Sequence, residues 1–522
     1  NFPAGFLFLG QERWLGIPAQ APIFILVAIG IWLLVHRTTF GRSFRAIGFA
    51  PEGTRYAGIS VERRLAMAYV LAGIIAAVAA IIYTSRLGQA KADAGMGYEL
   101  RAITAVVLGG TSIFGGVGTV YGTLLGVAAI AVLKSGLAQT RQPDEVADML
   151  TGLLLIVALS SSIIPKMLAS FKAHRQTFLT KPVIHCMKNI LSILLVAGVV
   201  LASGCGKSDS SNTSNNSSSG KKITIGLMPK SKGNAYFISC KKGADKAAKE
   251  LGVDLIFNGP TDPDPAKQNE IVENWITLGV DAIAVACENR EGISTALRKA
   301  KAKGIKVITY DADAQPDARE FFVNQATPEG IGYTLMDEAA RLCNEQGEFA
   351  IITASLTAAN MIEWQKHIEA RRASKYPNMK MIALRPCDDL KDKAQSEATA
   401  LLSANPNLKC IMAICSPAVP GAAEAVKQAG KAGQVKVLGL GLPNENKRYV
   451  HEGVTDAVVL WNTEDLGYLT IYAAHAVAKG ELKAGDKSIK AGSMGEFQVE
   501  GDNVLLGKPF IFNKSNIDQF DF

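Results

Sequence analysis

The 522-residue sequence lacks any recognisable arrangement of catalytic or metal-binding residues. None of its six histidines begins an HExxH pattern, and the Gly-x-Ser-x-Gly turn that presents a nucleophilic serine does not occur. Its eight cysteines are scattered, without a CxxC pair or a spacing typical of zinc ligands, so we expect most of them to be small buried apolar residues. These absences predict a protein that is not an enzyme and binds neither a metal nor a cofactor.

Charge is also sparse and unevenly distributed. Charged residues make up 20% of the sequence, with a formal net charge of +8. Residues 1–186 contain 16 Lys and Arg against 8 Asp and Glu, and residues 187–522 contain 39 of each. The positive excess therefore accompanies long uncharged runs, which is typical of loops that flank membrane spans rather than of a surface for nucleic-acid phosphates. We expect no nucleic-acid partner.

Four runs without a charged residue cover much of the first third of the chain, at residues 14–35, 65–85, 102–133 and 149–165. Each is near or above the roughly 20 residues that cross the bilayer core. The third run is too long for one ordinary helix and holds seven glycines between positions 109 and 126. This favours a short or re-entrant helix, a break and a full span. We predict an all-α membrane bundle of about five spans in residues 1–166.

Basic loops indicate how this bundle is oriented. Six arginines lie between the first two uncharged runs, and four basic residues lie between positions 166 and 181. Cytoplasmic loops carry an excess of Lys and Arg, so both segments are expected in the cytoplasm, with residues 171–186 forming a basic linker. The expected location is the bacterial inner (cytoplasmic) membrane.

Several short motifs of this part occur together in one transporter family. They are Gly-Arg-Ser at 41–43, Ala-Ile-Gly at 46–48, Gly-Ile-Ser-Val at 58–61, Gly-Tyr-Glu-Leu at 97–100 and Val-Val-Leu-Gly-Gly-Thr-Ser at 106–112. Residues 1–170 thus resemble the C-terminal half of ABC-importer permeases of the ribose/rhamnose/autoinducer-2 class.

The resemblance implies partners. In that family the cytoplasmic loop docks on the ATPase subunit, which implies that Glu52, Gly53 and Gly58 belong to a coupling element; the alternative is a merely solvated loop. The family's permeases have about twice as many spans, so a second permease subunit supplies the missing half or the sequence is a fragment. The Gly-Lys-Ser at 206–208 lacks the earlier glycine that a P-loop requires, so the ATP-binding subunit must be a separate chain.

Residues 187–205 read as a second start within the chain. A basic residue, an apolar run and small residues lead to Cys205. This resembles the lipobox of bacterial lipoproteins, in which the cysteine is lipidated and becomes the N-terminus after cleavage; an uncleaved signal-anchor helix is the alternative. Both interpretations carry the downstream chain out of the cytoplasm. The Ser/Asn-rich residues 206–220 are expected to form a flexible tether.

From residue 221 onward, short β-branched runs alternate with segments of helical period. A first series occupies residues 223–310, and a second begins near residue 349. We therefore predict two α/β lobes in residues 221–522, each with a parallel sheet covered on both faces. Ligands of such sheets bind at the carboxyl ends of the strands, so two facing lobes predict a hinged cleft.

A second resemblance covers nearly all of residues 221–522. Its motifs are Gly-Leu-Gly-Leu-Pro-Asn at 439–444, Leu-Trp-Asn at 460–462, Asp-Leu-Gly-Tyr at 465–468, Ala-Val-Ala-Lys-Gly-Glu at 476–481 and the end at 509–518. They are similar to those of periplasmic rhamnose-binding proteins, with autoinducer-2-binding proteins as relatives. The resemblance implies a type I periplasmic binding protein fold and a sugar-like ligand.

Such a ligand offers many hydroxyls and apolar C–H faces, so its site needs charged, amide and aromatic side chains. Asp311 follows the predicted strand 307–310 and could accept hydrogen bonds from two adjacent hydroxyls; a helix or turn cap is the alternative. Lys230 follows the first strand and could donate. Weaker candidates, several of which could equally pack the core or hinge, are Asn234, Tyr236, Phe237, Asn360, Trp364, Trp461 and Asn462.

The autoinducer-2 relatives provide a test of the ligand. Their binding set implies a Lys after the first-strand Pro, an Asp after a first-lobe strand, an adjacent Asp-Gln pair, and a Pro and an Ala in a later turn. Lys230 and Asp311 match, but the pair falls on Asn360 and Met361, and the later positions are an Ile at 414 and a Ser at 416. These departures slightly favour a deoxysugar such as rhamnose, whose methyl group would suit Met361 or the Ile.

The sequence as a whole therefore predicts an ABC-importer component in which a permease segment is joined to its own solute-binding lipoprotein. One alternative is an extracytoplasmic sensory receptor for autoinducer-2 or a sugar. Another is two adjacent proteins read as one chain, with a true start at Met187.

Overall fold

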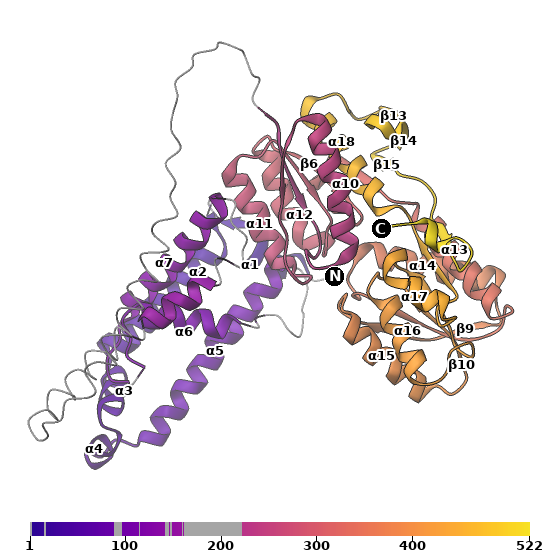
Figure 1. Cartoon of the computed structure of the whole chain (residues 1–522). Helices are drawn as coiled ribbons and strands as arrows, with labels where there is room; N and C mark the ends of the chain where they lie inside the picture. The colour runs from indigo at the N-terminus through magenta and orange to yellow at the C-terminus, as the bar shows by residue number, and fades with distance from the viewer. Residues whose placement is uncertain are drawn as a thin grey trace, which may run out of the picture.

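The computed structural model describes residues 3–14, 17–87, 95, 97–113, 115–140, 146, 149–158, 160 and 222–522. Figure 1 shows a first part made of long helices and a second part made of sheets covered by helices. The predicted order, an apolar helical region followed by two α/β lobes, is confirmed.

The first part is almost entirely helical. Its elements are α1 (Ala4–Gln11), the short antiparallel pair β1 (Arg13–Trp14) and β2 (Ile17–Pro18), α2 (Gln20–Arg37), α3 (Thr39–Phe49), α4 (Pro51–Tyr56), α5 (Val61–Leu87), α6 (Tyr98–Leu108) and α7 (Val120–Gln139). Among the described residues, the helices long and apolar enough to cross a membrane lie at Gln20–Arg37, Val61–Arg86 and Val120–Leu137, and a shorter apolar helix lies at Met149–Ala158. The remainder of the fourth uncharged run lies outside the described residues.

The glycine-rich run forms a short helix, a break and a long helix, as expected. Glycines allow α6 and α7 to pack with their backbones in contact. A Cβ added at Gly126 would lie 2.1 Å from the carbonyl oxygen of Ala105, and one at Gly122 would lie 2.0 Å from that of Gly109. Any larger residue at Gly122 or Gly126 would therefore push the two helices apart.

The first lobe contains an eight-stranded sheet of order β13-β14-β15-β7-β6-β5-β3-β4. Its strands are β3 (Thr224–Met228), β4 (Asp254–Phe257), β5 (Ala282–Val285), β6 (Lys306–Tyr310), β7 (Phe321–Asn324), β13 (Ser488–Lys490), β14 (Glu496–Glu500) and β15 (Asn503–Leu505). The ladder is parallel from β15 to β4. Helices α10 (Ala235–Leu251) and α18 (Thr463–Lys479) cover one face, and α11 (Pro265–Leu278) and α12 (Arg290–Ala302) cover the other.

The second lobe contains a six-stranded sheet of order β16-β12-β11-β10-β8-β9, parallel except for β16. Its strands are β8 (Gly347–Thr353), β9 (Met379–Pro386), β10 (Leu408–Ala413), β11 (Lys436–Leu440), β12 (Ala457–Leu460) and β16 (Phe510–Phe512). Its helices are α13 (Pro328–Leu342), α14 (Ala359–Lys375), α15 (Lys391–Ala404), α16 (Ala418–Gln428) and α17 (Pro443–His451). Helices α13 and α14 pack together, as do α15 and α16.

The chain crosses between the lobes three times, after β7, after β12 and after β15. The second crossing places α18 in the first lobe, where it packs against α10. Reciprocal glycines make this contact close. A Cβ at Gly467 would lie 1.8 Å from the carbonyl oxygen of Cys240, and one at Gly243 would lie 1.7 Å from that of Glu464. Three crossings beside one tightly packed helix pair connect the two lobes, an arrangement that suits a hinge.

Candidate ligand-binding site

A cavity of about 40 Å³ lies between the lobes, at the carboxyl ends of the strands. Residues following β3, β5 and β6 line it from the first lobe, and residues following β8, β9, β10 and β12 line it from the second. A cavity of this size holds one or two water molecules. A sugar is larger, so binding one requires the lobes to separate and these side chains to move.

Asp311 lies at the centre of the first-lobe half of the site. Its backbone φ of +61° is a left-handed conformation that costs energy for a residue with a Cβ. Asp311 is the first residue after β6. Its carboxylate lies in the site and accepts a hydrogen bond from the Tyr236 hydroxyl at 2.9 Å. Gln325 Nε2 donates to the Asp311 carbonyl at 3.0 Å and holds the turn.

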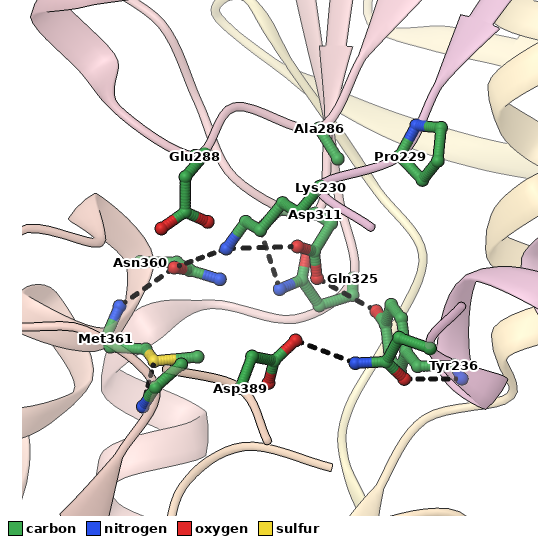
Figure 2. Close-up of polar contacts among 12 residues, drawn as sticks. Pro229, Lys230, Tyr236, Ala286, Glu288, Asp311, Gln325, Asn360, Met361 and Asp389 are labelled. Atoms are coloured by element: carbon green, nitrogen blue, oxygen red, sulfur yellow. Dashed lines mark hydrogen bonds and ion pairs between the residues drawn. The ribbon is translucent and has the colours of Figure 1, made fainter. Parts of the chain in front are cut away.

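Lys230 lies beside Asp311, and Figure 2 shows its amine between Asp311 and Asn360. The Lys230 Nζ is 3.6 Å from Asp311 Oδ2 and donates to Asn360 Oδ1 at 3.1 Å. Lys230 and Asp311 are each about 5% exposed. A buried charge pair of this kind costs desolvation energy, so it is weak evidence for a role in stability.

Burial and neighbouring charges act in opposite directions on these groups. Burial raises the pKa of Asp311, against the lowering effects of Lys230 and the Tyr236 hydrogen bond. Burial is the largest single effect on Lys230 and lowers its pKa, but Asp311, Glu288 and Asp389 together outweigh it, so the pKa of Lys230 is raised. Burial and Asp311 raise the pKa of Tyr236 well above its usual value, so this hydroxyl stays a donor. The site therefore presents a protonated lysine and phenol.

Gln268 on α11 fixes the loops that carry the first-lobe residues. Its Nε2 donates to the carbonyl oxygens of Pro229 at 3.0 Å and Ala286 at 2.8 Å, and its Oε1 accepts from the Glu288 backbone N–H at 3.0 Å. The side chain is fully buried. One amide thus fixes the position of the loop before Lys230 relative to the loop that carries Glu288, which preorganises this half of the site.

Hydrogen bonds across the cleft join the two halves. In addition to the Lys230–Asn360 bond, Asn234 Nδ2 donates to Asp389 at 2.7 Å, and the Ser416 hydroxyl donates to Asn234 Oδ1 at 3.1 Å. Burial raises the pKa of Asp389. These bonds satisfy polar groups that would otherwise be exposed to a ligand, so ligand hydroxyls could replace them one for one.

Aromatic rings form the wall at the hinge. Trp461 Nε1 donates to the Tyr236 hydroxyl at 2.8 Å, and the Trp461 ring centroid lies 6.2 Å from those of Tyr236 and Trp364. Phe237 packs edge-on against Tyr236 and is 3% exposed. It lines the cavity and also belongs to the first-lobe core. The apolar faces that a sugar ring needs are therefore present beside the polar groups.

The structure brings together eight of the nine residues predicted for this site, namely Lys230, Asn234, Tyr236, Phe237, Asp311, Asn360, Trp364 and Trp461. Asn462 does not line this cavity. Its side chain accepts hydrogen bonds from the backbone N–H groups of Glu464 and Asp465 and so caps α18. An Asn directly before a helix is a common cap, and that local role accounts for its position.

Sequence reasoning missed Glu288 and Asp389, which also line the cavity. Both follow strands, β5 and β9 respectively. The position of Glu288 after a buried strand was a usable signal. Asp389 lies in a turn in which Asp388 and Asp389 both have positive φ, of 52° and 57°, and the sequence there resembles an ordinary turn.

The other predicted positions lie elsewhere. Glu52 and Gly53 are on α4, and Gly58 follows it with a φ of +82°. Cys205, the linker 171–186, the segment 187–205 and the tether 206–220 are outside the described residues.

Two lobes, three crossings and a polar cavity at the hinge define a periplasmic binding protein domain. Residues 225–482 match the family model described as a periplasmic binding protein domain. Residues 2–159 match the model described as a branched-chain amino acid transport system / permease component. The chain therefore combines a segment of the permease family with a domain of the binding-protein family, and these are transport families rather than enzyme families.

Curated relatives match the first part. The autoinducer 2 import system permease protein LsrD of Yersinia pseudotuberculosis is 39% identical over 157 residues, which are 30% of this chain and 47% of that protein. The protein of the same name from Yersinia pestis is 38% identical with the same coverage. The chain thus spans about half the length of the curated relatives it matches.

Solved structures match the second part. LsrB from Clostridium saccharobutylicum in complex with AI-2 is 28% identical with a TM-score of 0.56, over 57% of this chain and 100% of that chain. An ABC transporter solute binding protein from Clostridium phytofermentas with bound L-rhamnose is 29% identical with a TM-score of 0.56, over 57% and 98%.

Proposed function

We propose that the chain is a component of an ABC importer that captures a monosaccharide or related small polyol, either rhamnose-like or autoinducer-2, and delivers it for ATP-driven uptake. The observation that carries this proposal is the cavity between the lobes, in which Lys230, Asp311 and Asn234 of the first lobe meet Asn360 and Asp389 of the second. A ligand that replaces these cross-lobe bonds would couple its own capture to lobe closure.

The chemistry of the cavity supports a hydroxylated ligand. Asp311 offers two carboxylate oxygens to neighbouring hydroxyls, and Lys230 offers donors to ring or hydroxyl oxygens. Trp461 and Tyr236 supply apolar surface for C–H faces. Lys230 pairs with Asp311, and Glu288 and Asp389 add two further carboxyl groups to the lining. The site therefore suits a neutral ligand with many hydroxyl donors better than an anion.

The second-lobe wall bears on which hydroxylated ligand binds. Asn360, Met361 and Ile414 stand where the autoinducer-2 relatives are expected to carry more polar or shorter residues. Met361 and Ile414 provide an apolar surface that a methyl group would fill. A deoxysugar such as rhamnose is therefore our first choice and autoinducer-2 our second, and the two similar structures contain one of these ligands each.

The proposed domains follow the predicted boundaries. Residues 1–170 form half a permease, 171–186 a cytoplasmic linker, 187–205 a lipidation signal or anchor, 206–220 a tether and 221–522 the binding domain on the extracytoplasmic side. The tether would keep the closed binding domain at high effective concentration near the pore.

The partners are a separate ATP-binding subunit and a second permease subunit or the missing permease half. The short helix α4 would contact the ATPase. Tyr56 at its end is 91% exposed and Phe49 just before it is 69% exposed. Two large apolar side chains exposed beside basic residues suit a protein contact in a cytoplasmic loop.

Calorimetric titration of the purified full chain in detergent with L-rhamnose and autoinducer-2, side by side, tests the proposal. Tight rhamnose binding without an autoinducer-2 signal would support a deoxysugar importer, and the reverse would support signal uptake. No heat with either compound, or with a wider panel of monosaccharides, would contradict a sugar-binding role.

A further inference from the structure

Two buried cysteines face each other beneath the second-lobe half of the site. Cys387 directly follows β9, and Cys415 lies two residues after β10. Their Sγ atoms are 3.4 Å apart, and the side chains are 0% and 3% exposed. Both are free thiols in this structure. In a disulfide the sulfurs are about 2.05 Å apart, so bond formation needs an approach of only about 1.3 Å.

The backbone around this pair is already fixed. The Cys387 N–H donates to the Thr353 carbonyl at 2.8 Å, and the Ile414 N–H donates to the Ile352 carbonyl at 2.8 Å. Both loops are thus held to the end of β8, which lies between β9 and β10 in the sheet. With these backbones held, the sulfurs already lie 3.4 Å apart, so the remaining approach has to come from rotation of the two side chains.

The two loops also carry residues of the ligand site. Asp389 lies two residues after Cys387, and Ser416 directly follows Cys415; both bond to Asn234 of the first lobe. Asp388 and Asp389 have left-handed backbones, which a loop keeps only when its surroundings hold it. A covalent bond at Cys387 would anchor the residue immediately before this turn.

We propose that Cys387 and Cys415 form a redox-sensitive disulfide site that clamps the two second-lobe loops of the ligand cavity. The oxidant is a small or protein disulfide. Each cysteine loses its thiol proton, and one S–S bond forms between Cys387 and Cys415. The two electrons and two protons pass to the oxidant disulfide, whose own S–S bond breaks to give two thiols. An extracytoplasmic location, which rests on the proposed function, provides such donors, whereas the cytoplasm keeps thiols reduced.

The cleft controls access to this site. Cys415 lines the interlobe cavity, and Cys387 lies behind it without exposure. Burial and the neighbouring Cys387 raise the pKa of the Cys415 thiol well above its usual value, so little thiolate is present while the lobes are closed. Oxidation therefore proceeds through the open form, and a ligand that closes the lobes should slow it.

Thiol mapping of the full chain in detergent tests the proposal. The reduced protein is incubated with oxidised glutathione and then unfolded in denaturant that contains a thiol-alkylating reagent. It is digested without reduction, and the peptides are analysed by mass spectrometry. We expect a peptide pair joined through Cys387 and Cys415, while Cys240 and Cys287, buried in the first lobe, are recovered alkylated. Recovery of Cys387 and Cys415 as separate alkylated or glutathione-bound peptides after prolonged oxidation would overturn the site.

Variants provide the second readout. Oxidised wild type should melt about 5 °C above its reduced form, because the cross-link closes a long loop. Cys387→Ala and Cys415→Ala should each abolish this redox-dependent difference, whereas the control Cys240→Ala should retain it. An equal difference in all of these proteins would contradict the assignment to this pair, even where one variant is less stable.

Ligand protection separates this inference from the proposed function. With a sugar that calorimetry shows to bind, cross-linking should slow at least severalfold at saturation. An unchanged cross-linking rate would contradict the inference that the oxidant reaches the cysteines through the cleft. Cross-linking in a chain that binds no sugar would support the disulfide site and contradict the proposed function.

Discussion

The two lobes contribute unlike halves to one site. The first-lobe half is charged and preorganised: Lys230 and Asp311 are buried against each other, Asp311 has a left-handed backbone, and Gln268 fixes the loops. The second-lobe half is mostly neutral, with Asn360 and Met361 at the start of α14. The contrast indicates that the first lobe anchors features common to many polyols, whereas the second lobe selects among ligands and closes over them.

The largest expected effect comes from removing the anchor. Asp311→Ala should weaken ligand binding by about 10- to 150-fold, since a charged hydrogen-bonding partner is worth on the order of 1.5–3 kcal/mol. The loss would also leave Lys230 buried without its carboxylate. Calorimetry of the full chain measures the change.

A matched control for this variant is Asp317→Ala. Asp317 is an exposed first-lobe carboxylate paired with Arg298, away from the cavity. Its removal should leave affinity unchanged. Equal affinities for wild type and Asp311→Ala, with both proteins folded, would contradict the assignment of the anchor to the first lobe.

Changing the selecting half should alter which ligand binds. The double variant Asn360→Asp, Met361→Gln restores the Asp-Gln pair expected in autoinducer-2 relatives, and the new carboxylate would lie within reach of Lys230, which already bonds to Asn360. We expect autoinducer-2 affinity to rise relative to rhamnose by about tenfold, the scale of one or two polar contacts. A parallel change in both affinities would argue against a selecting role for the second lobe.

The hinge between the halves can be tested at Trp461. Trp461→Phe keeps an aromatic ring but removes the Nε1 bond to the Tyr236 hydroxyl. We expect affinity to fall about fivefold, the value of about 1 kcal/mol for one neutral hydrogen bond. Trp364→Phe is the control, because its ring contacts Trp461 without a hydrogen bond to Tyr236. Equal losses in the two variants would indicate that ring packing alone matters.

Binding residues were easiest to predict from the sequence where a polar residue directly follows a buried strand. Asp311 and Lys230 were predictable because each follows a buried parallel strand, and the carboxyl ends of such strands meet at one edge. Asp389 was not, because β9 is a half-exposed edge strand and the turn after it depends on positive φ angles at Asp388 and Asp389. Asn462 was a plausible ligand-binding residue by position, but its side chain instead caps the N-terminus of α18.

Contacts between elements that are far apart in the chain limited the prediction of the fold. The sequence predicted two lobes in order, yet α18 and strands β13–β15 return to the first lobe before β16 completes the second. The glycines that permit this return, Gly243 and Gly467, are visible in the sequence, but their partner is more than 200 residues away. Periodicity reports which face of an element is buried and carries no information on which lobe buries it.

The smallest expected effect compares a carboxylate of the site with one that only supports the fold. Asp337 on α13 accepts two hydrogen bonds from Arg371 on α14, each of 2.8 Å, and one from Tyr376 at 2.9 Å. The Arg371 hydrogen bond lowers the pKa of Asp337 below its usual 3.8, opposite to the direction at Asp311. A lowered folded-state pKa means that its stabilisation is complete above about pH 3.8 and is lost as the pH falls through the folded-state value.

Asp337→Asn should therefore reduce the free energy of unfolding at pH 7 by about 0.5–1 kcal/mol, since the pair is partly exposed. The difference from wild type should shrink as the pH falls below 3.8. Ligand affinity should not change, because Asp337 does not line the cavity. Denaturant titrations at several pH values, with calorimetry at pH 7, measure both quantities, and a fall in affinity would show that the second lobe transmits strain from its outer helices to the selecting half of the site.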